Sequence, residues 1–327
     1  PKPWQVFQRQ TAFVGTVRVS GHVKEKADVV EIRISGKTVN EDLPDKWQPA
    51  TLDPSTHLFN AELSTPAGGW YTVQIRAKSG DKEIAKSEIT NVGVGEVFVI
   101  AGQSNSTNYG EKRLEPASGM ASTFDGSTWR PAADPQPGVH DNSSGGSPWA
   151  PFADAMVEHY HVPIGIASTG HGGTSVNAWM PDGELFRHTM GRIEQLGPHG
   201  FRAVLWHQGE SDAEQMPTDE YVAKMATIIA ASRRSAGWAF PWFVAQATYH
   251  PKDKVYKSIR DAQQHLWDMG IALQGPDTDT LTGDNRDTNG AGIHLSEKGL
   301  RAHGKMWADK VSAWLDKHLQ EEAPARP

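Results

Sequence analysis

The sequence predicts an α/β domain built on a parallel sheet and preceded by a small all-β sandwich. Up to residue 93 the chain contains short stretches in which apolar and polar side chains alternate. From residue 94, near-continuous apolar runs alternate with helical patterns instead. The 327 residues are also too many for one ordinary core and enough for two domains. We therefore expect a β-sandwich module at 1–93, an α/β domain at 94–320 and a flexible tail at 321–327.

The predicted sandwich depends on three alternating stretches. Apolar residues occupy every second position in Val17–Val19, Val30–Ile34 and Tyr71–Ile75. This period predicts antiparallel strands with one buried face. Turn residues separate the stretches, and short strands at this spacing are typical of a β-sandwich.

The predicted parallel sheet depends on four apolar runs of the kind that form strands buried on both faces. These runs are Val97–Ala101, Val162–Ala167, Ala203–Trp206 and Trp242–Ala247. Helical patterns lie between them, at Phe152–His159, Leu185–Leu196, Glu220–Arg233 and Ser258–Leu266. Alternation of this kind indicates a sheet covered by helices on both sides.

The second domain is also predicted to contain a long final helix and one long loop. Ser296 is a suitable N-cap for a final helix with one apolar face, formed by Leu300, Trp307, Val311, Trp314 and Leu315. Residues 109–147 are rich in Gly, Pro, Asp and Ser and are expected to form a long loop. Loops of that length in compact domains are often functional.

Composition excludes several classes of protein. Hydrophobic residues make up 37% of the chain and charged residues 22%, as in soluble globular proteins. The net charge of -7 comes without a basic block, which argues against a nucleic-acid partner. No apolar run approaches the about 20 residues that span a bilayer. The chain has no Cys, which excludes disulfides, thiolate metal sites and a Cys nucleophile.

Two further features bear on location and ligand. The chain opens with Pro1 to Trp4 and shows no signal-peptide pattern, and we expect either a mature chain whose signal was removed or a sequence that starts internally. We expect a secreted or periplasmic protein. The 12 Trp provide flat surfaces of the kind that bind sugar rings.

The stretch with the clearest chemistry is the one that follows the run Val97–Ala101. It continues as Gly102-Gln103-Ser104-Asn105, a Gly turn at the end of a predicted buried strand. Open α/β folds bind ligands at the carboxyl edge of the sheet. Ser104 is therefore a candidate nucleophile, and the alternative is that it only N-caps the next helix.

Three more polar segments are predicted at the same edge of the sheet. They are Gly170–Trp179, Trp206–Asp212 and Gly292–Ser296. A Gly pair after a strand leaves backbone N–H groups open to a ligand oxygen. Polar side chains directly after a buried strand are costly unless they are paired or functional. His294 is the candidate base in the last segment, with His250 as the reserve candidate, because triad members are often distant in sequence.

The glycine spacing disfavours two other enzyme classes. A dinucleotide enzyme needs G-x-G-x-x-G after the first strand, but Gly102 stands alone. An α/β-hydrolase needs G-x-S-x-G, but Ser106 occupies the last position. A non-catalytic glycan-binding protein remains the alternative. It accounts for the β-module and the Trp content, but not for four polar segments at one edge.

Together the four segments resemble the SGNH (GDSL-type) hydrolase superfamily, and within it the sialate O-acetylesterase and acetylxylan-esterase branch of carbohydrate esterases. The matching residues are Gly102 to Asn105, Gly172, Gly173, Thr174, Trp179, His207 to Asp212 and His294. The resemblance covers residues 94–316 and implies a three-layer α/β/α domain. It implies an esterase that acts on an acetylated sugar or polysaccharide and needs no cofactor or metal. The β-stretch ahead of these motifs weakly resembles the N-terminal module of sialate O-acetylesterases.

The resemblance also implies a role for each site residue. Ser104 would attack the ester carbonyl and His294 would transfer the proton. The N–H groups of Ser104 and Gly173, with the side-chain amide of Gln208, would hold the oxyanion. The oligomeric state does not follow from the resemblance.

One position departs from the family pattern. The family usually has an Asp three residues before the catalytic His, and here that residue is Ala291. Glu210 is the preferred substitute for the orienting acid. Asp284 and Asp287 lie on the same loop as His294 and stay open as alternatives, as does a Ser–His dyad without an acid.

Overall fold

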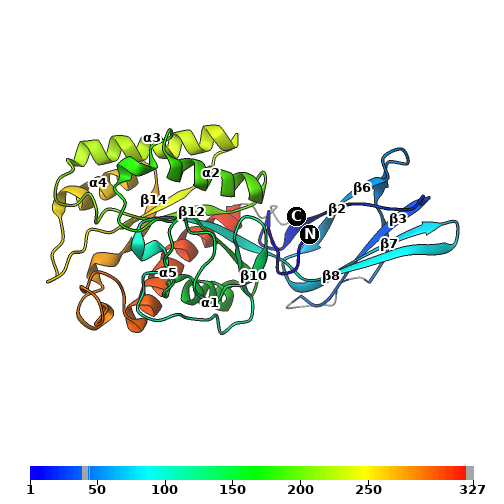
Figure 1. Cartoon of the computed structure of the whole chain (residues 1–327), viewed down its shortest axis with the longest axis horizontal. Coiled ribbons are helices and arrows are strands. Elements are labelled where there is room, and N and C mark those ends of the chain that lie inside the picture. Colours follow the sequence, from blue (N-terminus) through cyan, green and yellow to red (C-terminus); the bar gives the residue numbers. More distant parts are fainter. Residues whose placement is uncertain (39–42, 44, 322–327) are drawn as a thin grey trace.

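The computed structural model describes residues 1–38, 43 and 45–321. An elongated all-β part lies beside a layered α/β part, and one long strand runs through both (Figure 1). That strand, β8, extends over Lys82–Gly102. Its first half pairs antiparallel with β7 (Gly68–Ser79), and its second half pairs parallel with strands of the α/β part. The two parts therefore share one continuous sheet.

The α/β part is built on a mainly parallel sheet, as the sequence predicts. The strand order is β10-β9-β11-β8-β12-β13-β14, in which only the edge strand β10 is antiparallel. The bounds are β9 Ala121–Phe124, β10 Trp129–Pro131, β11 Ile164–Ser168, β12 Ala203–His207, β13 Trp242–Gln246 and β14 Leu273–Asp277.

Helices cover both faces of this sheet (Figure 1). Their bounds are α1 Trp149–Tyr160, α2 Glu184–Leu196, α3 Thr218–Ala236, α4 Lys257–Asp268 and α5 Glu297–Glu321. Alternate residues of β8 divide between the two cores. Val97 and Val99 pack with residues of α2, α3 and α4, whereas Phe98 and Ile100 pack with α1 and α5. This is the expected three-layer α/β/α arrangement.

The structure corrects the predicted long loop. Residues 109–147 contain β9 and β10, and β14 was also missed. Strand β9 has the sequence ASTF, in which Ser122 and Thr123 are fully buried. Two central polar residues conceal a buried strand from a search for apolar runs. Strand β14 contains Gly275 and Pro276, which are normally loop signals.

The part of the chain before the α/β layers contains only strands among its described elements. They are β1 Val6–Gln8, β2 Val14–His22, β3 Val29–Ser35, β4 Gln48–Pro49, β5 Thr51–Leu52, β6 Leu58–Pro66 and β7. A second sheet, of order β2-β6-β5, shares a core with β3, β7 and the start of β8. A domain boundary at residue 93 stays a prediction, because β8 crosses it without interruption. The predicted tail at 321–327 begins one residue too early, because α5 extends to Glu321, and its residues 322–327 lie outside the described residues.

A fully buried ion cluster joins the two parts. Glu96, on β8, accepts hydrogen bonds from Arg9 Nε at 2.7 Å and Arg202 Nε at 2.8 Å. Gln8 Nε2 donates to the same carboxylate at 2.8 Å. Burial works to raise the pKa of Glu96, but the charges of Arg202 and Arg9 lower it overall. Arg9 belongs to the all-β part and Arg202 precedes β12, so this carboxylate ties three distant segments together.

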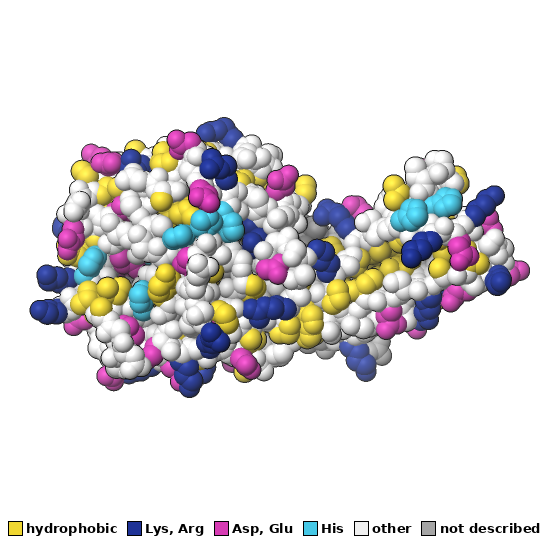
Figure 2. Space-filling model, viewed as in Figure 1, with side chains coloured by type: hydrophobic (Ala, Val, Ile, Leu, Met, Phe, Trp, Pro, Cys, Tyr) yellow, Lys and Arg dark blue, Asp and Glu magenta, His cyan; other side chains and the backbone are white. Residues whose placement is uncertain are grey.

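The surface carries charges of both signs. On the face drawn in Figure 2, Lys and Arg side chains are interspersed with Asp and Glu over the α/β part. Hydrophobic side chains form a band along the all-β part on the same face. Of the helices in the described part of the chain, none combines the length and the apolar character that crossing a membrane requires.

We expect Glu96→Gln to lower the free energy of unfolding by about 3–5 kcal/mol, because it leaves two buried guanidinium groups without their counter-charge. Denaturant unfolding monitored by Trp fluorescence measures the loss. Arg18→Ala is the matched control. Arg18 pairs with Glu62 in the exposed part of the sheet, so its removal should cost at most about 1 kcal/mol. Equal losses in the two variants would contradict the assignment.

Candidate active site

The candidate nucleophile is presented by a turn that only glycine can make. Gly102 ends β8 with a φ of +126°, and a Cβ atom there would lie 2.1 Å from the carbonyl oxygen of His207. Gln103 N–H donates to that same oxygen at 2.8 Å. The chain then turns into a 3-10 helix at Ser104–Ser106. Ser104 is its first residue and Gln103 is the N-cap, so the alternative that Ser104 is merely an N-cap is wrong.

Ser104 and Gly173 line the same pocket. Gly173 lies in the loop after β11 with a φ of +69°, a conformation that glycine adopts without strain. Its neighbours are anchored: His171 N–H donates to Gly102 O at 2.9 Å, and Gly172 N–H donates to Asp141 Oδ2 at 2.6 Å. Among the described residues, the N–H groups of Ser104 and Gly173 have no acceptor. Both are therefore free to bind an anionic oxygen.

One pocket gathers most of the predicted site residues. Its volume is ≈ 360 Å³. It is lined by Gln103, Ser104, Tyr109, Gly172, Gly173, Glu210, Ser211, Tyr249, His250, Ile293 and His294. The structure thus brings together the predicted nucleophile, backbone donor, base, reserve base and acid. Gln208 is not among the lining residues.

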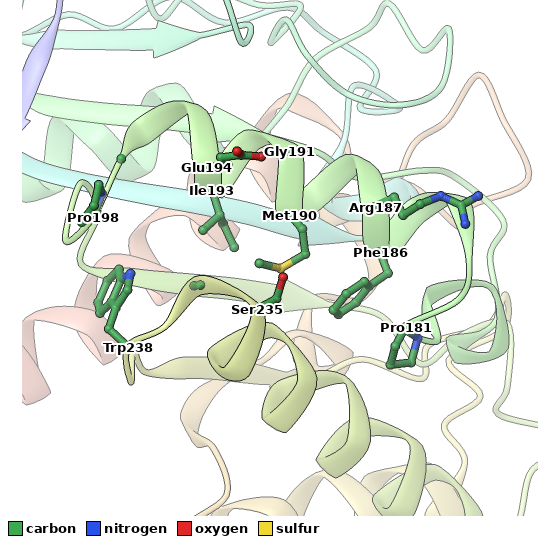
Figure 3. Close-up of a pocket in the computed structure, with 12 residues that line it drawn as sticks. Pro181, Phe186, Arg187, Met190, Gly191, Ile193, Glu194, Pro198, Ser235 and Trp238 are labelled. Atoms are coloured by element: carbon green, nitrogen blue, oxygen red, sulfur yellow. The ribbon is translucent and has the colours of Figure 1, made fainter.

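This 360 Å³ pocket is not the largest hollow in the molecule. A groove of about 570 Å³ lies between α2 and the end of α3, where Phe186, Met190 and Trp238 line it (Figure 3). That groove contains none of the predicted site residues. Chemistry rather than size therefore identifies the candidate site.

Glu210 is buried in the pocket wall and already paired. Its Oε1 accepts from His207 Nε2 at 2.9 Å and from Asn105 Nδ2 at 3.0 Å, whereas its buried Oε2 has no partner among the described residues. Burial works to raise the pKa of Glu210, but the charge and hydrogen bond of His207 lower it overall. Asn105 Nδ2 also approaches Ile293 O at 3.5 Å. Glu210 is thus linked to the residue beside His294 through a neighbour and not directly.

His294 is held mainly through its backbone. Its N–H donates to Asp287 Oδ1 at 3.2 Å, and its carbonyl accepts from Asp287 N–H at 3.0 Å. Burial lowers the pKa of the His294 ring below its usual value, against the opposing charges of Asp287 and Glu210. Ser104 and His294 line one pocket without a hydrogen bond between them. Such bonds often tighten only when substrate binds.

Asp284 and His250, the alternative acid and the reserve base, are not placed to work with Ser104 and His294. Asp284 is 89% exposed and pairs with Lys298, so its carboxylate faces solvent and not the ring of His294. His250 lines the pocket, but its Nδ1 lies 3.0 Å from Thr248 O. Neither geometry makes these two residues part of a Ser104–His294 relay.

The side chain of Gln208 does not lie where an oxyanion donor is expected. The side chain is fully buried, and its amide nitrogen donates to Asp212 Oδ2 at 2.6 Å and Thr174 O at 3.1 Å. Its side-chain oxygen accepts from Tyr221 Oη at 3.0 Å. An amide NH₂ has two hydrogens, and both are engaged here. The prediction that Gln208 holds the oxyanion has no support in this geometry, which instead makes Gln208 a brace for the Gly173 loop.

Sequence analysis missed several residues that shape the site. Tyr109 and Tyr249 line the pocket, Asn105 bridges Glu210 to the His294 loop, and Asp141 anchors Gly172. Asn105 was inside a recognised motif but had no assigned role. Tyr109 and Asp141 lay in the segment predicted to be a loop, where no local pattern marks them. Among the described residues, no group of three or more His, Asp or Glu is placed to hold a metal ion.

Solved structures share this fold. A carbohydrate acetylesterase from Xanthomonas citri is 18% identical, with a TM-score of 0.61 over 95% of this chain and 73% of that one. A protein from Arabidopsis thaliana is 20% identical, with a TM-score of 0.53 over 68% of this chain and 98% of that one. NanS is 17% identical, with a TM-score of 0.50 over 69% and 98% of the two chains. No curated protein matches the sequence.

A family model matches the sequence itself. The model describes the carbohydrate esterases called sialic acid-specific acetylesterases (SASA), and it matches residues 94–313. This span is more than half of the chain and contains all four segments of the site. The match to an esterase family favours an enzyme over the alternative of a non-catalytic glycan-binding protein. The chain therefore belongs to the SASA family of carbohydrate esterases and is a carboxylic ester hydrolase.

Proposed function

We propose that the protein is a serine esterase that removes O-acetyl groups from a carbohydrate, of the sialic acid or the plant or algal polysaccharide type, through an acyl-enzyme. The observation that carries this proposal is the single pocket lined by Ser104, Gly173 and His294. An enzyme for such polymers works where the polymer is, so we also propose a secreted or periplasmic location.

The proposed reaction has two halves. Ser104 Oγ attacks the acetyl carbonyl carbon while His294 takes the hydroxyl proton. The N–H groups of Ser104 and Gly173 bind the oxyanion. The ester bond to the sugar then breaks, His294 returns the proton to the sugar oxygen, and an acetyl group stays on Ser104. Water attacks this acetyl group while His294 takes a proton from the water; the bond to Ser104 Oγ then breaks, His294 returns the proton to Oγ, and acetate leaves.

The electrostatics of the pocket support His294 as the base. Burial lowers its pKa, so the imidazole is neutral and able to accept a proton near pH 7. Asp287 and Glu210 act in the opposite direction. These negative charges stabilise the imidazolium that forms when Ser104 is deprotonated. Glu210 fulfils the electrostatic part of the acid's role, and its bond to Asn105 positions the nucleophile turn.

We expect Ser104→Ala to fold normally and to lose activity on an aryl acetate by about 10⁴-fold or more, because no attacking hydroxyl remains. Steady-state kinetics and thermal unfolding measure the two effects. Ser235→Ala, in the groove of Figure 3, is the matched control and should keep full activity. Retained turnover in Ser104→Ala would refute the nucleophile assignment.

We expect kcat/KM on the aryl acetate to rise with pH and to level off, with its inflection below the ordinary His value of 6.5. The reason is that only neutral His294 accepts the proton. In Glu210→Gln the inflection should move to still lower pH, because a negative charge that raises the pKa of His294 is gone. A pH series on both proteins measures the shift. An inflection that moves upward would show that Glu210 does not stabilise the imidazolium.

We expect Glu210→Gln to reduce kcat by less than the about 10⁴-fold seen when a triad acid bonded to the base becomes an amide, because Glu210 acts on His294 through its charge and bonds to His207 and Asn105 instead. Asp284→Asn is the control, since Asp284 faces solvent, and should behave as the unaltered protein. Asp287→Asn keeps an oxygen for the His294 N–H, so its loss should be smaller than that of Glu210→Gln. If Asp287→Asn shows the largest loss, Asp287 is the orienting acid.

A further inference from the structure

Within the described part of the chain, the ring of the candidate base has no hydrogen-bonded partner of the kind that a triad supplies. Ala291 stands where the family places an Asp, and among the described residues no group bonds to either ring nitrogen of His294. Asp287 bonds to its backbone, and Glu210 bonds to His207 and Asn105. A base must nevertheless hold its accepting nitrogen toward the nucleophile. Something other than a carboxylate has to restrain the ring.

The aromatic ring that contacts His294 is that of Tyr109. The two ring centroids lie 4.9 Å apart, with 31° between the planes. Rings at this distance attract one another, and the face of a Tyr ring also attracts a cation. The contact therefore restrains the imidazole and favours the imidazolium that forms during the reaction.

Tyr109 is itself held in place at both ends. On one side of it in sequence, Asn108 exchanges hydrogen bonds with Gln136, at 2.9 and 2.6 Å. On the other side, Gly110 N–H donates to Gly146 O at 2.9 Å. The tip of the ring lies against Gly172, where a Cβ atom would stand 2.6 to 2.7 Å from Tyr109 Cε2, Cζ and Oη. The ring thus connects His294 with the loop that carries Gly173.

We propose that Tyr109 is a positioning residue that holds the imidazole of His294 toward Ser104 and does part of the work of the missing Asp. This inference rests on the proposed function. Tyr109 is also 39% exposed, so a different role is a stacking surface for the sugar. The two roles differ in which kinetic constant they affect.

The test compares Tyr109→Phe with Tyr109→Ala on ethyl acetate, a substrate without a ring to stack, and on acetylated xylan. A positioning role predicts that Tyr109→Ala lowers kcat by about tenfold or more on both substrates, with KM little changed. Tyr109→Phe keeps the ring and should restore kcat to within about twofold. A loss confined to KM on xylan would overturn the proposal in favour of a sugar platform. Thermal unfolding of both variants shows that the fold is intact.

A double-mutant cycle with Gly172 tests the contact between Tyr109 and the Gly173 loop. Misfolding of a variant would not give the pattern of kcat values that this cycle predicts. In Gly172→Ala the new methyl group pushes the Tyr109 ring, so kcat should fall about fivefold, whereas in the Tyr109→Ala background the same change should cost nothing further. Equal losses in both backgrounds would overturn the proposal. Ser104→Ala separates the two hypotheses: if it is inactive while Tyr109→Ala is unaffected, only the role of Tyr109 is wrong. If Ser104→Ala is active, the proposed function fails as well.

Discussion

The position of the site depends on the burial and pairing of strand β8. This strand is bonded on both sides, to β11 and β12, and its alternate side chains enter two different cores. At its end, Gly102 packs directly on His207 O. This close contact restricts the direction of the chain where it turns away from the sheet. The proposed nucleophile, Ser104, follows Gly102 by two residues and is therefore anchored to the sheet. Glu96 fixes the same strand at the point where it enters the α/β part.

The polar residues after β12 join the loops at this edge of the sheet. His207 bonds to Glu210, and Gln208 bonds to Asp212. Asp212 Oδ2 in turn accepts from Val176 N–H at 2.8 Å. Each buried polar group is costly unless it finds a partner, and two of these acids also bond to other segments: Asp212 to Val176, after the Gly173 loop, and Glu210 to Asn105, in the Ser104 turn. The cost of burial is therefore offset by bonds that hold the Ser104 turn, the Gly173 loop and the β12 loop in one arrangement.

Sequence predicted the elements whose local pattern is strong. The apolar runs at Val97–Ala101 and Ala203–Trp206 became central strands, and Ser296 caps α5 through its Oγ, which accepts from Gly299 N–H at 3.2 Å. Motifs at strand ends also met in one pocket, because the carboxyl ends of parallel strands share an edge. What a motif does not specify is where a side chain points. The amide of Gln208 lies in the right segment, but Asp212 and Thr174 engage it.

The residues that sequence missed act through tertiary contacts alone. Tyr109 matters because its ring meets His294 and Gly172, which are 185 and 63 positions away in the chain. No periodicity or local spacing encodes such a contact. Strand β9 was missed for a related reason. Its Ser122 and Thr123 are polar and would be expected at the surface, but the neighbouring strands bury them.

The loop of His294 shows how a site can tolerate Ala291 where an acid is usual. Arg286 is buried beneath Tyr249, with its guanidinium carbon 3.5 Å from that ring's centroid, and it donates to the carbonyl oxygens of Leu281, Thr278 and Ile293. A planar cation with five donors can bind several carbonyls of one loop at once. These bonds fix the backbone of the loop in addition to the bonds between His294 and Asp287. In the mechanism proposed here, orientation of the base His294 is then shared between a cation that holds the backbone, an aromatic ring that restrains the imidazole and a buried carboxylate that supplies charge. An acid at position 291 would combine the last two tasks, and their separation removes the need for it.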